Sequence, residues 1–194
     1  LRNNLKKSGV KLTFMPFFIK SFSLALLDFP MMNSTYDSSK PFEYTVWDNH
    51  NITIAIDTPN GLAVPNVKNC QAKTIYEIQA DLERLRKDAE AGRISPKDIF
   101  DGTISISNIG NIGGTYLSPV ILQPQVAIVA LGKTQVLPRY IEKGNDLELQ
   151  PRRIMNVSFS CDHRVLDGAS VAKFSNKWKS YLENPTSMLL NLHQ

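Results

Sequence analysis

Residues 154–183 read IMNVSFSCDHRVLDGASVAKFSNKWKSYLE, and this stretch predicts a strand, a turn and a helix in succession. Apolar residues in alternation indicate the strand over Ile154–Cys161. Apolar side chains at helical spacing then cover about Ala169–Glu183. The segment between strand and helix carries His163 and, four residues later, Asp167. Both side chains therefore lie on a loop held by a rigid element on either side, where catalytic residues commonly collect.

His163 has the side chain best suited to proton transfer near neutral pH, and a carboxylate such as Asp167 can fix its tautomer. The same spacing also allows a simpler interpretation, in which Asp167 caps the helix and His163 is an ordinary surface residue. Cys161 precedes His163 by two residues, so the two side chains would share a face of the strand as a thiol–imidazole pair. A small buried hydrophobic residue is the more common role for such a cysteine.

A second candidate site follows from the segment Gly102–Asn108, in which polar and apolar residues alternate strictly. This pattern predicts a strand with one polar face. Ser107, near its end, would either donate a hydrogen bond to a developing oxyanion or be an ordinary serine on a solvated face. The loop at residues 110–114 is rich in glycine but fits neither nucleotide-binding fingerprint, so it gives little support to a nucleotide-binding fold. The polar face comprises Thr103, Ser105 and Ser107, and the apolar face Ile104 and Ile106.

The remaining chain adds strands and helices without an internal repeat or a linker, which predicts one domain over residues 1–194. The mixture indicates an α/β (α+β) two-layer sandwich, in which helices cover one face of a mixed sheet. The predicted elements are a helix over 14–28 that ends before Pro30, a hairpin of Asn51–Asp57 and Gly61–Val67, a helix between a Thr74/Glu77 capping box and Gly92, a buried strand at Val126–Leu131 and a short final helix after Asn184.

Composition and charge exclude several classes of protein. An apolar fraction of 42% and a charged fraction of 21% are typical of a globular domain, and no apolar run approaches the roughly 20 residues that span a bilayer. The net charge of +4 is spread over small clusters without interleaved aromatic residues, so we expect neither a nucleic-acid nor a membrane partner. Two cysteines are too few for a zinc site, and His50 and His193 have no partners at metal-ligand spacing, so no metal is predicted.

Two motifs give the chain a specific resemblance. The segment 162–168, Asp-His-Arg-x-x-Asp-Gly, and the segment 107–115, Ser-Asn-Ile-Gly-x-Ile-Gly-Gly-Thr, are similar to the two active-site motifs of dihydrolipoamide acyltransferases, the core subunits of 2-oxo acid dehydrogenase complexes. The similarity continues through nearly the whole chain. The segments 154–158 and 178–185 most resemble the branched-chain member of the family. The resemblance implies an N-terminally truncated catalytic domain, with the lipoyl and subunit-binding domains absent.

The resemblance also implies a fold like that of chloramphenicol acetyltransferase and a trimer whose active sites lie between subunits. His163 and Asp167 would come from one subunit and Ser107 from its neighbour, while coenzyme A and the lipoyl arm would enter a tunnel from opposite ends. Thr13 and Arg86 stand where the family pattern has a serine and a glutamine. The residues that match the family's coenzyme A contacts are Arg2, Thr13, Asp57, Arg86, Ser107, Asn108 and Gly132.

The activity implied by the resemblance is transfer of a branched-chain acyl group from S-acyl-dihydrolipoyl to coenzyme A. Trimers would assemble into a cubic 24-mer core through the apolar end of the chain, Thr186–Leu192, unless that segment folds back on its own subunit. The partners would be the decarboxylase and the dihydrolipoamide dehydrogenase of the complex, in the mitochondrial matrix of a eukaryote or the cytoplasm of a bacterium. The alternatives are a pyruvate or 2-oxoglutarate member, a non-catalytic core scaffold, which would lack the histidine, and an antibiotic O-acetyltransferase.

Overall fold

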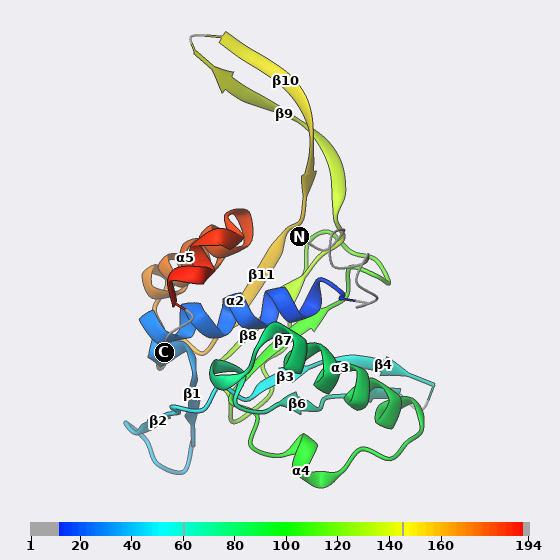
Figure 1. The fold of residues 1–194 in the computed structure, drawn as a ribbon. Coiled ribbons are helices and arrows are strands. Elements are labelled where there is room, and N and C mark those ends of the chain that lie inside the picture. Colours follow the sequence, from blue (N-terminus) through cyan, green and yellow to red (C-terminus); the bar gives the residue numbers. More distant parts are fainter. Residues whose placement is uncertain (1–11, 60, 145, 192–194) are drawn as a thin grey trace.

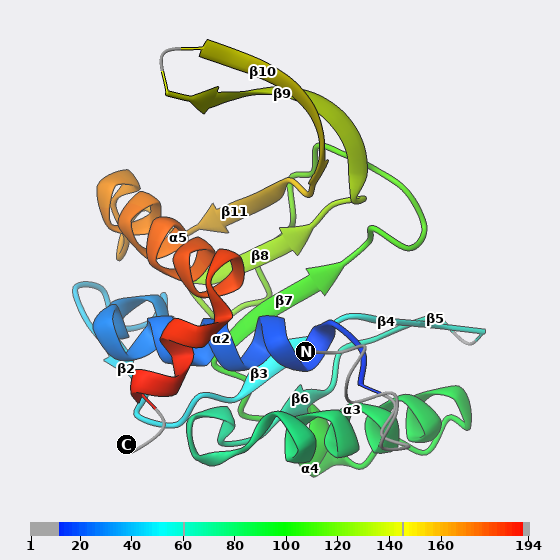
Figure 2. The same ribbon diagram turned by 45° about the horizontal axis from the view of Figure 1, so that its top comes forward.

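The structure, a computed structural model, describes residues 12–59, 61–144 and 146–191 of the chain. Its centre is a five-stranded mixed sheet in which three inner strands are parallel and both edge strands are antiparallel to their neighbours. Three helices, α2 (Met15–Asp28), α3 (Ile75–Glu90) and α5 (Gly168–Glu183), cover one face of it (Figures 1 and 2). The predicted two-layer fold is confirmed. The strands lie in the order β11 (Val157–Cys161), β8 (Ala127–Leu131), β7 (Ile104–Asn108), β3 (Ile52–Ile54) and β6 (Asn66–Val67).

The helix α2 is central and packs between α3 and α5. Its apolar composition and the proline at Pro16 in its first turn fit a buried helix that ends before Pro30. Phe22 is fully buried, and its ring centroid lies 4.9 Å from that of Phe174 and 5.1 Å from that of Trp178, both edge to face. This aromatic cluster fixes α5 against the helix layer, and with it the turn that precedes α5.

The capping box predicted for α3 is confirmed. Thr74 accepts a hydrogen bond from the backbone N–H of Glu77, whose carboxylate accepts one from the backbone N–H of Thr74. Beyond the helix, Gly92 has a φ of +65°, the left-handed conformation that glycine favours. Arg84 donates to both carboxylate oxygens of Asp98 in α4 (Pro96–Ile99), each at 3.0 Å, and so ties α3 to the segment that leads into β7.

The predicted hairpin of residues 51–67 is confirmed, but it divides into two parts. The strands β3 and β6 pair within the main sheet, whereas β4 (Ile56–Thr58) and β5 (Gly61–Ala63) form a separate two-stranded ribbon. Pro65 stands between β5 and β6 and has no N–H for a ladder, although its carbonyl accepts a hydrogen bond from Ile54 at 2.8 Å. The ribbon therefore continues beyond the sheet.

Two antiparallel hairpins are missing from the sequence prediction. The strand β1 (Ser34–Tyr36) pairs with β2 (Tyr44–Val46), and β9 (Gln135–Lys143) pairs with β10 (Asp146–Ile154) in an arm that projects from the body of the molecule (Figures 1 and 2). Pro138 and Pro151 lie opposite each other in that arm, and a proline argues against a strand unless the strand lies at an edge. The strand predicted over Ile154–Cys161 is wrong at its start, because Ile154 ends β10 and the sheet strand begins at Val157.

The polar side chains around the start of β7 are buried, so this part of the strand does not have the solvated face that one interpretation gave it. Thr103 and Ser105 are 3% and 4% exposed, and Ser107 at the end of the strand is half-buried. Ser105 donates a hydrogen bond to Gln125, which donates another to Thr53 on β3 at 3.0 Å. These side chains form a polar network between strands, since buried polar groups need partners.

The C-terminal segment forms a 3₁₀ helix, η3 (Pro185–Asn191), where a short helix was predicted. Met188 is buried in the hydrophobic core of the chain, whereas Leu189 is 61% exposed. The side chains of Leu190 and Leu192 lie outside the described residues. Two further 3₁₀ turns are η1 (Pro30–Met32) and η2 (Cys70–Ala72), and no helix in the described part of the chain is long and apolar enough to cross a membrane.

Candidate active site

His163 is exposed on the turn between β11 and α5, as the sequence predicts. The backbone of this turn is fixed at its start, where Asp162 donates a hydrogen bond to the carbonyl of Val126 at 2.8 Å. Val165 and Leu166 both donate back to the carbonyl of Asp162, at 3.1 and 3.0 Å. Leu166 is buried in the hydrophobic core. An exposed imidazole is thus carried by a backbone that is anchored on both sides.

Asp162 and Arg164 flank His163 and bind each other. One carboxylate oxygen of Asp162 accepts hydrogen bonds from the backbone N–H of Arg164 at 3.0 Å and from its Nε at 2.9 Å, and the other accepts from Nη2 at 2.6 Å. The guanidinium of Arg164 holds the pKa of the Asp162 carboxyl below its usual range. The guanidinium carbon also lies 4.0 Å from the centroid of the Tyr36 ring, in cation–π contact.

Asp167 caps the N-terminus of α5. Its Oδ1 accepts a hydrogen bond from the backbone N–H of Ser170 at 2.7 Å, and its Oδ2 accepts one from the Ser170 hydroxyl at 3.1 Å. These hydrogen bonds hold the pKa of Asp167 below its usual range, so the carboxylate is charged at neutral pH. Within one subunit, no hydrogen bond between Asp167 and His163 is present in the described residues. The two hydrogen bonds to Ser170 confirm the predicted capping role of Asp167.

An open cavity of about 370 Å³ lies beside the turn, between β11 and α5, and is lined by His163 and Asp167. Burial raises the pKa of the Cys161 thiol, which also lines this cavity, to about 11, so this thiol is not a ready nucleophile. Cys161 packs against the core, which confirms its prediction as a small hydrophobic residue. The remaining walls, mainly apolar, are Phe159, Leu166, Gly168, Val171, Ala172 and Ser175.

The second candidate lies at the opposite end of the sheet. Ser107 and Asn108 end β7, and Gly132 directly follows the neighbouring parallel strand β8. The glycine-rich loop packs against this point, because a Cβ on Gly110 would lie 2.5 Å from the carbonyl oxygen of Gly132. Glycine is required there for the close approach of two backbones. The structure thus brings together three of the residues that the resemblance predicts as coenzyme A contacts, Ser107, Asn108 and Gly132.

His163 and Ser107 are far apart within one subunit. Ser107 is paired with Ala130, and Ala130 with Ser158 on β11, which runs in the opposite direction. His163 lies five residues beyond Ser158, toward the start of β8. At about 3.3 Å per residue and about 4.8 Å per strand, the two backbones are separated by roughly 16 Å along the strands and roughly 10 Å across them. One subunit therefore carries both groups without joining them in one site.

The family described as 2-oxoacid dehydrogenases acyltransferase (catalytic domain) matches residues 1–190. The chain belongs to this family. It is 54% identical over 196 residues to the mitochondrial lipoamide acyltransferase component of the branched-chain alpha-keto acid dehydrogenase complex of Bos taurus, and 51% identical over 193 residues to the component of the same name in Caenorhabditis elegans. Each alignment covers 99% of this chain but 40% and 42% of these relatives, so the chain spans about two fifths of their length.

Solved structures agree with the fold of this acyltransferase domain. The cubic core of the pyruvate dehydrogenase multienzyme complex and the dihydrolipoamide acetyltransferase of Azotobacter vinelandii each match with a TM-score of 0.87 at 30% identity, over 97% of this chain and 75% of theirs. Chloramphenicol acetyltransferase matches with a TM-score of 0.58 at 14% identity, over 93% of this chain and 82% of its own. The predicted likeness of fold is confirmed.

The other predicted coenzyme A contacts of the acyltransferase domain lie toward the end of the sheet that carries Ser107. Thr13, before α2, donates hydrogen bonds from its N–H and its hydroxyl to the Gln79 side chain on α3, both at 3.0 Å. Asp57 on β4 and Arg86 on α3 are exposed. The start of α2, the strand β4 and the later half of α3 lie toward the ends of β7 and β8, away from the start of α5 (Figure 2). Arg2 lies outside the described residues.

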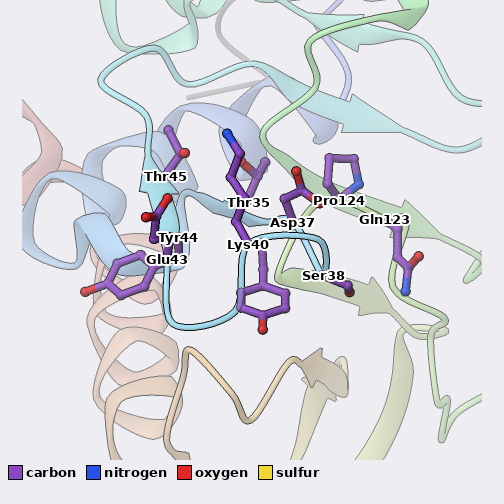
Figure 3. A pocket seen from close by; sticks show the side chains of 10 residues that line it. Thr35, Asp37, Ser38, Lys40, Glu43, Tyr44, Thr45, Gln123 and Pro124 are labelled. Atoms are coloured by element: carbon purple, nitrogen blue, oxygen red, sulfur yellow. The ribbon is translucent and has the colours of Figure 1, made fainter.

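The sequence prediction missed the residues of β1 and the following loop, which lie beside the His163 turn. Tyr36 lines a cavity of about 580 Å³ there and also a neighbouring one of about 320 Å³ that includes Asp162 and Arg164. A three-residue strand has too little periodicity to detect, so no sequence signal singled out Tyr36. Figure 3 shows the larger cavity, lined by Thr35, Tyr36, Asp37, Ser38, Lys40, Glu43, Tyr44, Thr45, Gln123 and Pro124.

Proposed function

We propose that this domain transfers a branched-chain acyl group from S-acyl-dihydrolipoyl to coenzyme A, as the catalytic core of a branched-chain 2-oxo acid dehydrogenase complex. The observation that carries the proposal is His163, an exposed imidazole on a turn anchored through Asp162 and Asp167. The substrate class is supported by 54% identity to a lipoamide acyltransferase of that complex, against 35% and 36% to two acetyltransferase components of pyruvate dehydrogenase complexes.

His163 is the general base of the proposed reaction. A free thiol has a pKa of about 8.5, so only a few per cent of coenzyme A is thiolate at neutral pH. His163 takes the proton from this thiol, and the sulfur attacks the carbonyl carbon of the acyl-dihydrolipoyl thioester. The bond between that carbon and the dihydrolipoyl sulfur then breaks, and His163 returns the proton to the leaving sulfur. The products are acyl-coenzyme A and dihydrolipoyl, without an acyl-enzyme.

Ser107 has the complementary role and comes from a neighbouring subunit. Its hydroxyl, at the end of β7, donates a hydrogen bond to the oxyanion that develops on the thioester carbonyl. Asp167 holds the start of α5 and the end of the His163 turn, and carries no proton itself. The choice of a serine and a histidine is supported by the Azotobacter vinelandii acetyltransferase, where the roles of a serine, a histidine and an asparagine in the catalytic mechanism were investigated.

Coenzyme A would lie on the Ser107 side of the domain. The exposed guanidinium of Arg86 suits a phosphate, and the exposed side chains of Thr13 and Asp57 supply polar partners nearby. Asn108 and Gly132 lie next to Ser107, where the reactive end of the molecule would arrive. The acyl-lipoyl arm would approach from the His163 side, where the cavity of about 370 Å³ has mainly apolar walls.

The proposed assembly is the homotrimer that the family resemblance implies. The positions of His163 and Ser107 at opposite ends of one sheet support active sites that are shared between subunits. Trimers would associate into a cubic 24-mer core, as supported by the similarity to a cubic core of the same family. The lipoyl group and the attachment of the decarboxylase and the dihydrolipoamide dehydrogenase would belong to other parts of the full protein. The mitochondrial relatives support a location in the mitochondrial matrix.

An acyl-transfer assay with a panel of acyl-dihydrolipoamides tests the function. We expect isobutyryl and isovaleryl donors to give acyl-coenzyme A faster than acetyl or succinyl donors, and His163→Ala to give none. A preference for acetyl or succinyl donors would instead identify a pyruvate or 2-oxoglutarate type. Absence of transfer from every donor by intact trimers would identify a scaffold, and acetylation of chloramphenicol an antibiotic acetyltransferase.

A further inference from the structure

Arg164 is the residue of the Asp-His-Arg motif that the proposed reaction does not use. Its side chain is 52% exposed, and yet it makes three hydrogen bonds to the Asp162 carboxylate, two from Nε at 2.9 and 3.1 Å and one from Nη2 at 2.6 Å. An exposed arginine normally samples several rotamers, so this two-oxygen contact defines one conformation. The contact spans His163, since its two partners are the residues on either side of it.

Tyr36 supports this arginine from a separate strand. The guanidinium carbon of Arg164 lies 4.0 Å from the ring centroid, a distance typical of a cation–π contact. Tyr36 is itself fixed, because its backbone N–H donates to the carbonyl of Pro124 at 2.9 Å. Asp162 is fixed to the same segment through its hydrogen bond to the carbonyl of Val126 at 2.8 Å. The strand β1 and the turn are thus both attached to residues 124–126.

We propose that Arg164 is a positioning residue, whose guanidinium binds Asp162 along its edge and stacks on Tyr36 with its face, and so fixes the direction in which His163 points. The effect on catalysis rests on the proposed function. The effect on the turn does not, because it follows from the contacts alone.

Both contacts of Arg164 depend on the shape of its guanidinium. A guanidinium is planar, so its edge can bind a carboxylate while its face lies on a ring. A lysine ammonium keeps the positive charge but can satisfy only one of these contacts well. Misplacing a catalytic group by about 1 Å can cost up to about 100-fold in rate, so modest loosening of this turn is enough to affect turnover.

A different role for Arg164 would be direct attraction of a negatively charged substrate group. The two roles give opposite results in Arg164→Lys, which keeps the charge and loses the geometry. If Arg164 positions His163, Arg164→Lys and Arg164→Met should each lower kcat roughly 10-fold and leave both KM values within about twofold. If it binds substrate, Arg164→Lys should retain kcat and Arg164→Met should raise KM.

The Tyr36 variants test the second contact. We expect Tyr36→Phe, which keeps the ring, to retain kcat, and Tyr36→Leu to lower it roughly threefold without a change in KM. Arg93→Met, at an exposed arginine after α3, is the matched control for Arg164→Met and should have the kcat and KM values of wild type. Equal kcat values for Tyr36→Phe and Tyr36→Leu would show that the ring does not support Arg164.

Hydrogen exchange of the trimer provides a measurement independent of activity. Peptides covering residues 160–166 should exchange faster in Arg164→Lys and Tyr36→Leu than in wild type, while peptides of α2 should be unchanged. Unchanged exchange at residues 160–166 would overturn the proposal. Faster exchange throughout the molecule, together with recovery of kcat at low temperature, would also overturn it, because the variants would then have lost overall stability. A wild-type trimer that transfers no acyl group would overturn the proposed function, and exchange would still decide the role of Arg164.

Discussion

The two ends of the central sheet are built by different means. At the end where β11 leaves the sheet, side chains hold the structure, since Asp162 binds Arg164 and Asp167 caps α5. At the other end the backbones do so, since the loop at Gly110 approaches Gly132 too closely for a side chain. The first end carries the imidazole of His163 on an exposed turn. The second end carries the hydroxyl of Ser107 beside two closely packed backbone segments. The proposed reaction uses both groups, and a symmetric oligomer would bring the first end of one subunit to the second end of its neighbour.

The largest effect should come from the first end. His163→Ala should abolish detectable turnover, because general-base catalysis contributes about 10²–10⁴-fold and no other described side chain of the turn can replace the imidazole. The mass of the particle should be unchanged by light scattering, because the side chain of His163 is not part of the hydrophobic core. A variant that retains more than about a tenth of the wild-type kcat would show that another group is the base.

At the second end, Ser107→Ala should lower kcat roughly 100-fold, because a hydroxyl that donates mainly to the transition state contributes about that much. The KM for coenzyme A should change little. Steady-state kinetics with coenzyme A as the varied substrate separate this result from a role in substrate binding, in which KM rises and kcat is retained.

Mixing the two inactive variants tests whether the His163 end of one subunit meets the Ser107 end of another. Subunits with His163→Ala and subunits with Ser107→Ala, unfolded and refolded together in equal amounts, should recover about one quarter of wild-type activity, because about one site in four combines two intact residues. The same variants refolded separately and then mixed are the control. If the two residues act within one subunit, joint refolding restores nothing.

The packing of the second end should appear in stability. Gly110→Ala should lower the free energy of unfolding by about 1–3 kcal/mol, because the new methyl group would overlap the backbone of Gly132. Gly168→Ala is the matched control at the first end, where a Cβ meets no atom within 4 Å, and it should change stability by about 0.5 kcal/mol or less. Urea denaturation of both variants measures the difference.

The smallest effect should come from Asp167→Asn. Asparagine caps helices about as well as aspartate, so the start of α5 should be preserved and kcat should stay within about threefold of wild type. Asp167→Ala removes the cap and should lower both the melting temperature and kcat. A large loss of kcat in Asp167→Asn with an unchanged melting temperature would show that the negative charge itself takes part in the reaction.

The sequence predicted elements whose pattern is local. The capping box at Thr74, the apolar run of β8 and the strand–turn–helix around His163 each carry their signal within a few residues. The arm of β9 and β10 was missed because prolines such as Pro138 and Pro151 are uncommon inside strands. They are tolerated here because no third strand among the described residues pairs with the arm. That property belongs to the topology and is not visible in the local sequence.

The candidate site also has some features that the local sequence predicts and others that depend on the tertiary structure. Residue type and position made His163 and Ser107 candidates beside a simpler interpretation, and the resemblance to the family then implied the roles proposed for them. The burial of Ser105 and Thr103 could not be predicted, because an alternating strand does not reveal whether its polar face meets solvent or Gln125. Likewise, the contact between Arg164 and Tyr36 joins residues more than a hundred positions apart, and no local pattern encodes it.

The fold keeps the thiols of both cysteines in their unreactive, protonated form. In a site where acyl groups pass between sulfur atoms, any thiolate of the protein is a competing acceptor. Burial raises the pKa of Cys70 to about 12 and that of Cys161, which lines the His163 cavity, to about 11. At pH 7 such thiols are ionised to only about one part in 10⁴ or less. Both cysteines are therefore poor competitors for the acyl group in the proposed reaction.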